Sequence, residues 1–518
     1  MKKRQIHLML WAVLAVFLLA SCSKVPKSAQ LIPEDAMFVL RVDVKQIADK
    51  SGFDDDSKAK KKLTEALKEA DMSRAAREKA EAILDDPAKA GLDLRDPLFI
   101  YGSENKSKED IGIVGSILNK DDFTDLLNTF AAEADIEKVK EKEDVSYFAQ
   151  NKIVVVYNND CFFIGEKAYN QEVDDFVADV KKKFDGDGKN TMAESDDMKK
   201  MCSSDGIMQL LFNCEGLTKM RDFNDAEQML PGGLKYKDIS YLFNLSVEKG
   251  EATLNTEVIA KSDAWKEHLE KSEKLVGNIG SELTKYISNE GLAMFANIDG
   301  AGLYDMVKDS EVLKKADADS RELIQKLLSS IDGDMAFDLS DFNTEYSYPV
   351  YSAYIQTKDK TIVDLISSQA GENTRKTADG ISQPLAYDYS GGDFSKEAPV
   401  VATSEIGFKN NTTYFVGGAK PEPFKAAAKP FSQGDIKGKG FYACFNFGLL
   451  NKIANNANNS SSETLKMIAN VFDKAELYYE GDGKAVLTVT MKDKEHTPIE
   501  SIMDMVLKYL DYQVVESA

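Results

Sequence analysis

The sequence predicts an α+β protein made of two tandem homologous domains, each an antiparallel-rich sheet with helices packed on it. Apolar runs of two-residue period end in residues that cap helices, and amphipathic stretches lie between them. The same segments then recur in the same order roughly 250 residues further along the chain. We place the first domain at residues 33–277 and the second at residues 285–518.

The opening strand of each predicted domain shows the duplication most clearly. Residues 36–43 and residues 291–299 both read as a strand that ends in an aspartate, Asp43 in one copy and Asp299 in the other. An aspartate at the end of a strand can cap a helix that begins directly after it. An apolar residue follows each aspartate after four positions, as expected for a helix that packs on a sheet.

Later segments continue the match. Residues 153–165 and residues 404–417 each read as two short strands around an Asn-Asn pair, which is typical of a hairpin. Each half then closes with two alternating strands and an amphipathic helix. The last helix is marked by a capping box that begins at Thr497, with Pro498 at the first helical position.

The N-terminus predicts export and lipid attachment. An uncharged apolar run at residues 8–20 follows three basic residues, which is typical of a secretory leader. About 13 apolar residues are too few to cross a bilayer, which takes about 20. The run ends in a branched apolar residue, two small residues and Cys22, which matches the lipobox of bacterial lipoproteins. We therefore expect residues 1–21 to be a signal peptide and Cys22 to carry the lipid.

The residues after the predicted cleavage site indicate a tether and an address. Residues 22–32 include Pro26 and show no periodicity, so we expect an extended tether. In lipoproteins at large, a residue such as Ser23 in the second mature position indicates sorting to the outer membrane. The segment after Cys22 lacks the acidic run that marks export to the cell surface. The sequence favours a lipid-anchored protein of the outer membrane that faces the periplasm, and a position on the cell surface stays open.

The composition excludes several classes of partner. The net charge is −22, and it becomes −25 when Lys2, Lys3 and Arg4 leave with the leader. Such an acidic chain is a poor partner for nucleic acid and for anionic lipid headgroups, so the acyl chains on Cys22 are the expected membrane attachment. A hydrophobic content of 43% excludes a disordered chain.

Histidine and cysteine offer little for catalysis or metal binding. Beyond the leader the histidines are His268 and His496, and no GxSxG motif occurs, so we expect no Ser-His-Asp site, no zinc site and no cofactor. Trp265 precedes His268 by one helical turn, and we favour packing of this helix on its sheet over a small-molecule site. Whether Cys202 and Cys214 form a disulfide stays open.

Carboxylates leave one class of enzyme open. Glycoside hydrolases need two carboxylates about 5–9 Å apart, and a chain with 87 acidic residues could contain such a pair. The densest regular pattern consists of Asp332, Asp334, Asp338 and Asp341. We expect these four to be exposed at strand edges and turns.

Tyrosines gather in one part of the second half, and the matching part of the first half is not similarly aromatic. A tyrosine combines a flat apolar face with a polar edge, which suits contact with a glycan or a peptide. Tyrosines half-buried on strand surfaces are the competing interpretation. The candidate binding residues are Tyr346, Tyr348, Tyr351, Tyr387 and Tyr389.

The entry into the first strand carries a resemblance to a family. Leu31-Ile32-Pro33-Glu34-Asp35-Ala36, together with the lipobox and with Asp43 and Ile47, resembles Bacteroides-type predicted lipoproteins known only as a domain of unknown function. The resemblance covers essentially the whole mature chain. It implies the location given above, and no functional residue comes with it.

The sequence therefore favours a membrane-anchored envelope lipoprotein that acts as a non-enzymatic binding module, with an envelope protein or a glycan as partner. A glycan-active hydrolase with paired carboxylates is the first alternative. A purely structural envelope protein is the second.

Overall fold

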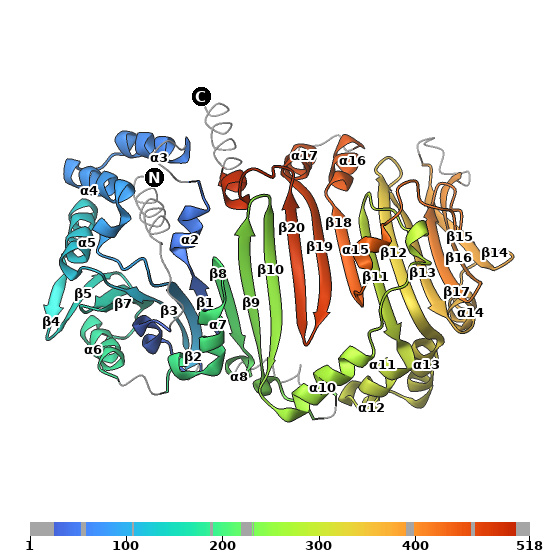
Figure 1. Ribbon diagram of the computed structural model, residues 1–518, viewed down its shortest axis with the longest axis horizontal. Coiled ribbons are helices and arrows are strands. Elements are labelled where there is room, and N and C mark those ends of the chain that lie inside the picture. Colours follow the sequence, from blue (N-terminus) through green and yellow to red (C-terminus); the bar gives the residue numbers. More distant parts are fainter. Residues whose placement is uncertain are drawn as a thin grey trace. The chain divides into compact units, whose positions relative to one another are not determined.

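A computed structural model describes most of the chain, in residues 25–52, 58–105, 108–186, 190–218, 230–231, 233–389, 398–456 and 461–503. The predicted leader and Cys22 lie outside the described residues. The chain divides into two compact units, which we call unit 1 (residues 1–224, 236–261 and 494–518) and unit 2 (residues 225–235 and 262–493). Helices and antiparallel strands in both units confirm the predicted α+β class (Figure 1).

An antiparallel sheet forms the frame of unit 1. Its strands are β1 (Phe38–Val42), β2 (Leu98–Asn105), β3 (Lys108–Ser116), β4 (Lys140–Lys142), β5 (Val145–Gln150), β6 (Ile153–Tyr157), β7 (Cys161–Glu166), β8 (Met208–Asn213), β9 (Ile239–Glu248) and β10 (Glu251–Ala260). They pair in the order β4-β5-β6-β7-β3-β2-β1-β8-β9-β10. The hairpin predicted at residues 153–165 is confirmed as β6 and β7.

Helices cover the sheet of unit 1. They are η1 (Lys27–Leu31), α2 (Val44–Asp49), α3 (Lys58–Glu69), α4 (Arg74–Asp85), η2 (Pro87–Ala90), α5 (Lys120–Ala134), α6 (Val173–Phe184), η3 (Met192–Glu194), α7 (Asp196–Ser203), α8 (Cys214–Leu217) and η5 (Tyr236–Asp238). One face of the sheet packs on η1, α6, η3 and α7 and forms the largest core of the unit.

The extended tether predicted for residues 22–32 is wrong in its second half. Residues 27–31 form η1, and Ala29, Leu31 and Ile32 are buried in the core of unit 1. The few apolar residues of this segment stand among polar ones, so no local pattern predicts that they are buried. They are buried in the structure because they pack on α6 and η3. The folded body therefore begins within a few residues of Cys22.

Unit 2 is built on a second antiparallel sheet. Its strands are β11 (Leu292–Asp299), β12 (Ile331–Asn343), β13 (Tyr348–Thr357), β14 (Arg375–Lys376), β15 (Gly380–Tyr387), β16 (Val400–Lys409), β17 (Thr412–Gly418), β18 (Phe441–Asn446), β19 (Phe472–Gly481) and β20 (Lys484–Met491). They pair in the order β14-β15-β16-β17-β13-β12-β11-β18-β19-β20. This is the order of unit 1 with each strand number raised by ten.

In unit 2, loop segments cover more of the core than helices do. The helices are α10 (Asp263–Lys274), η6 (Thr284–Tyr286), α11 (Gly300–Val307), α12 (Glu311–Lys315), α13 (Ala318–Ser330), α14 (Thr361–Ser368), α15 (Gln433–Ile436), α16 (Gly448–Asn456) and α17 (Ser461–Val471). Residues 279–287 and 424–436 pack on one face of the sheet, around Phe295, Tyr354 and Tyr442. Among the described residues, none of the helices is both long and apolar enough to span a bilayer.

The predicted caps are present in both units. The carboxylate of Asp43 accepts a hydrogen bond of 3.0 Å from the backbone N–H of Gln46 in α2, and that of Asp299 accepts one of 3.1 Å from Gly302 in α11. The capping box at Thr497 is confirmed as well, because Thr497 Oγ1 accepts a 3.2 Å hydrogen bond from the N–H of Glu500. Local sequence was sufficient here because a cap involves residues only a few positions apart.

The boundaries of the two units differ from the predicted ones at the closing helices. Helix α10 follows β10 of unit 1, yet residues 262–277 belong to unit 2, where Asp299 N donates a 2.9 Å hydrogen bond to the carbonyl of Leu275. Residues 494–503 follow β20 of unit 2 and belong to unit 1, where the carbonyl of His496 accepts a 2.8 Å hydrogen bond from Gly250 N. Sequence order assigned each helix to the half that precedes it, and packing assigns it to the other.

Candidate functional site

The tyrosines predicted as binding residues lie at one end of the sheet of unit 2. We call this the tyrosine end and define it as residues 343–351, 385–389 and 398–403. Strand β17 stops at Gly418, opposite Thr403 of β16. Strands β13 and β16 continue past that point, and their side chains meet those of β15 in a small apolar cluster. Residues far apart in sequence are brought together there.

Two of the five tyrosines are packing residues. Tyr348 is buried against Ala386 and Ala402 in this cluster. The ring of Tyr351 fills the space over Gly417, where an added Cβ would lie 2.2 Å from the ring, and its hydroxyl lies 2.8 Å from Ser404 Oγ. A ligand would have no access to most of either side chain.

The other three tyrosines form the accessible part of the tyrosine end. The side chain of Tyr389 is 63% exposed, and its ring centroid lies 6.1 Å from that of the half-buried Tyr387. Tyr346 is partly buried at the edge of the same cluster. The charge of Asp388 is the main cause that raises the pKa of the Tyr346 hydroxyl. The surface thus combines apolar ring faces, hydroxyl groups and a carboxylate, and it suits a neutral polar ligand such as a glycan, or a peptide.

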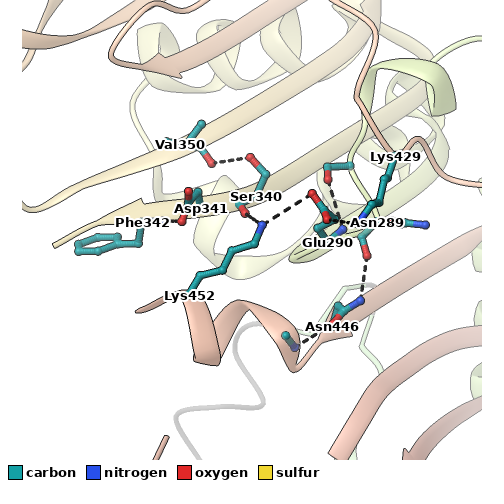
Figure 2. Close-up of polar contacts among 11 residues, drawn as sticks. Asn289, Glu290, Ser340, Asp341, Phe342, Val350, Lys429, Asn446 and Lys452 are labelled. Atoms are coloured by element: carbon teal, nitrogen blue, oxygen red, sulfur yellow. Dashed lines mark hydrogen bonds and ion pairs between the residues drawn. The ribbon is translucent and has the colours of Figure 1, made fainter. Parts of the chain in front are cut away.

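A cluster of ion pairs between side chains lies at the same end of the sheet. Glu290 accepts a 2.6 Å hydrogen bond from Lys429 Nζ, and its other oxygen lies 3.7 Å from Lys452 Nζ. Figure 2 shows Lys452 of α16 between Glu290 and the carbonyl of Ser340, to which it donates a 3.4 Å hydrogen bond. The hydrogen bond from Lys429 is the main cause that lowers the pKa of Glu290. These contacts hold α16 and the start of β11 against the end of β12, so we assign them a structural role.

The acidic pattern on β12 was predicted to be exposed, and for two of its members the prediction is wrong. Asp334 and Asp338 are both buried. The carboxylate of Asp334 accepts hydrogen bonds of 3.0 Å from Gly280 N and 2.7 Å from Asn297 Nδ2. The Oδ1 atom of Asp338 has no hydrogen-bond partner in the part of the chain that the structure describes, and burial raises the pKa of this carboxyl to about 7.

The two buried carboxylates do not form a hydrolytic pair. They lie four residues apart on one strand, so their Cα atoms are about 13 Å apart at about 3.3 Å per residue. Acid and base carboxylates of glycoside hydrolases lie about 5–9.5 Å apart. This spacing gives no support to the hydrolase alternative at β12.

The alternation along β12 explains why its carboxylates were misplaced. Asp334, Ala336 and Asp338 share one face of the strand, whereas Met335 and Phe337 point to the other. A sequence pattern of this kind predicts that the apolar set faces the core. In the structure the carboxylate face is the buried one. The donors that satisfy Asp334 come from Gly280 and Asn297, which no local pattern connects with β12.

The remaining candidates behave as packing residues. Trp265 donates a 2.7 Å hydrogen bond from Nε1 to the carbonyl of Lys235, and its ring stands edge-on to His268 at 5.5 Å. Burial lowers the pKa of His268, which disfavours its charged form. Cys202 and Cys214 are buried free thiols, each with its pKa raised to about 11 by burial. In the described residues, no group of three or more His, Cys, Asp or Glu side chains could hold a metal ion.

Comparison with known proteins gives a family and little else. None of the curated proteins compared with the chain matches it. Among solved structures, "Structure of crystal form IV of TP0453" is 12% identical over 50% of this chain and 88% of that chain, with a TM-score of 0.24. "Structure of crystal form III of TP0453" is 13% identical over 49% of this chain and 89% of that chain, also with a TM-score of 0.24. At these TM-scores the likeness carries no argument about this chain. The family described as Domain of unknown function (DUF4836) matches residues 29–385, and the chain belongs to that family.

Proposed function

We propose that this protein is a lipid-anchored envelope lipoprotein that binds a partner, an envelope protein or a glycan, and performs no catalysis of its own. The observation that carries the binding role is the pair formed by Tyr387 and the largely exposed Tyr389, beside Tyr346, at the end of a rigid sheet. Tyrosines held this way contribute large contact area at low cost in conformational entropy. The lipobox at Cys22 and the short apolar leader support the anchor.

The proposed anchor places the folded body close to the membrane. The chain is packed on the core of unit 1 from Val25 onwards, so only Ser23 and Lys24 separate Cys22 from the fold. The three Cα–Cα steps from Cys22 to Val25 reach at most about 11 Å when fully extended. We propose the outer membrane as the location, with the body facing the periplasm.

We also propose that the two units descend from one duplicated domain. The identical strand order of the two sheets supports this. So do the aspartate caps that end β1 and β11. The cluster of Tyr346, Tyr387 and Tyr389 belongs to unit 2, which supports a binding role acquired by one copy after the duplication.

The anchor is tested by Cys22→Ser in the native host. Without the acceptor sulfur no diacylglycerol can be attached, so we expect complete loss of labelling by radioactive palmitate and a move from the membrane fraction to the soluble fraction. Cys202→Ser is the matched control, because that thiol is buried and free and lies far from the lipobox in sequence. If Cys22→Ser still incorporates palmitate and sediments with membranes, the lipoprotein assignment is wrong.

The binding role is tested by Tyr387→Ala together with Tyr389→Ala in the anchored protein. A tyrosine at the centre of an interface contributes about 2 kcal/mol or more, so we expect a loss of partner recovery of at least about thirtyfold. Recovery is measured by quantitative mass spectrometry after crosslinking and by co-sedimentation with purified cell-wall glycan. Tyr169→Ala is the control, because this side chain is 86% exposed and lies in unit 1. Equal recovery by the double variant and the control would remove the tyrosine end as the binding site.

A further inference from the structure

Over five neighbouring strands, one face of the sheet of unit 2 consists of apolar side chains and the ring of Tyr479. We call it the apolar face. The register of β12, β11, β18, β19 and β20 places its residues in three rows across the strands. The rows are Leu339, Leu292, Phe445, Ala475 and Val489; Phe337, Met294, Ala443, Leu477 and Leu487; and Met335, Ala296, Phe441, Tyr479 and Ala485.

The apolar face is not part of the core. None of its fifteen side chains is buried, and Met294 and Leu477 in the central row are each 37% exposed. The core of unit 2 lies on the opposite face, around Phe295 and Tyr442. Antiparallel sheets with one face on a core carry polar residues on the other face, so a sheet that is apolar on both sides indicates a second partner.

The chemistry of the apolar face excludes a polar ligand. Its one polar atom is the hydroxyl of Tyr479, which accepts a 3.1 Å hydrogen bond from Gly483 N and lies 3.4 Å from a carboxylate oxygen of Glu273. A hydrogen-bonding group placed against this surface would lose water and gain no partner, which costs free energy. The ligand that fits is a hydrocarbon.

The size of the apolar face separates the possible hydrocarbon partners. Five strands about 4.8 Å apart span about 19 Å, and three rows span about 14 Å, so the footprint is roughly 270–400 Å². A stable dimer needs about 800 Å² from each partner, so a second copy of the chain is too large for this surface alone. One acyl chain spans half of the hydrocarbon core of a bilayer, which is about 30 Å thick. Its length is therefore about 15 Å, and it fits within the face. Met294 and Met335 can adapt to a flexible chain.

We infer that the apolar face of unit 2 binds the acyl chain of a single lipid molecule. The inference goes beyond the proposed function and does not depend on the lipid at Cys22 or on the tyrosine end. Its site is the central row, where Leu477 and Met294 are neighbours of Ala443 across β19, β18 and β11.

The test uses the full chain carrying Cys22→Ser, so that its own lipid cannot occupy the face and failure of the anchor assignment does not affect the result. The probe is radioactive 1-palmitoylglycerol, an uncharged single-chain lipid that an acidic chain does not repel, measured by equilibrium dialysis. We expect saturable binding, and we expect Leu477→Glu to bind one molecule fewer per chain because a carboxylate against the hydrocarbon removes the site. Met294→Glu should have the same effect.

Leu323→Glu is the matched control. Leu323 is 38% exposed, close to the 37% of Leu477, and it lies on α13 outside the apolar face. The Leu323→Glu variant should therefore bind as many lipid molecules per chain as the parent. Circular dichroism checks that all variants fold. Absence of binding by the parent overturns the inference, and so does equal binding by Leu477→Glu. A dimer in sedimentation that Leu477→Glu abolishes, or binding to phosphatidylcholine vesicles without binding of 1-palmitoylglycerol, would assign the face to a second copy or to a bilayer surface instead.

Discussion

Asp338→Asn is expected to raise the free energy of unfolding at pH 8 by roughly 2–4 kcal/mol. Burial raises the pKa of Asp338 from 3.8 to about 7 in the folded chain. Between these values the folded state holds a proton that the unfolded state has released, so stability falls as the pH rises through this window. A shift of about three units corresponds to about 4 kcal/mol above pH 7, and an asparagine removes that cost except for what its buried N–H groups lose.

The pH dependence of this variant is the decisive measurement. Urea unfolding should give Asp338→Asn a clear advantage over wild type at pH 8 and nearly the same stability at pH 3, where the aspartate is largely protonated in both states. Asp334→Asn is the matched control on the same strand. It weakens the hydrogen bonds from Gly280 and Asn297, so it should cost about 1–3 kcal/mol. A loss of stability at pH 8 in Asp338→Asn would mean that the hydrogen bonds this carboxylate accepts from Ser288 and Ser352 outweigh the cost of burying its charge.

Asp43→Asn is expected to lower the free energy of unfolding of unit 1 by about 3–5 kcal/mol. Asp43 and Arg41 are both buried on β1, and a carboxylate oxygen of Asp43 lies 3.7 Å from a guanidinium nitrogen of Arg41. Asparagine keeps an acceptor for the cap on α2 but removes the negative charge. A buried cation that loses a nearby carboxylate is strongly destabilised, and burial already lowers the pKa of Arg41.

A second substitution separates the charge from the cap. Arg41 pairs across β1 and β8 with Gln209, whose side chain accepts a hydrogen bond from it. The matching position in unit 2, two residues before Asp299, is the uncharged Asn297. Arg41→Met combined with Asp43→Asn should therefore recover at least half of the loss, measured by urea unfolding. If the double variant is no more stable than Asp43→Asn alone, the loss comes from the cap and not from the ion pair.

Much of the fold follows from the sequence because it depends on neighbours in the chain. Alternation placed the hairpin of β6 and β7, and capping residues placed the starts of α2, α11 and the helix after Thr497. These features involve interactions between residues a few positions apart, which a sequence pattern records directly. The strand order could not be read in this way, because it depends on pairings between strands such as β1 and β8 that lie far apart in the chain.

The candidate site shows the same division. The sequence singled out five tyrosines by type and proximity, and the structure separates them: Tyr348 and Tyr351 pack inside the tyrosine end, whereas Tyr389 is largely exposed. That difference arises where β13 and β16 extend past β17, and no single segment encodes it.

The sequence by itself determined the fold class, the helix caps and the proposed lipid attachment at Cys22, since each is a property of adjacent residues. Only the tertiary structure decided which face of β12 is buried. The alternation of residue types shows that the two faces of β12 differ. Which face is buried depends on which one other segments cover, and here these segments are residues 279–287 and 424–436. These segments cover the carboxylates of Asp334 and Asp338. The apolar side chains on the opposite face are the ones for which we infer a lipid ligand.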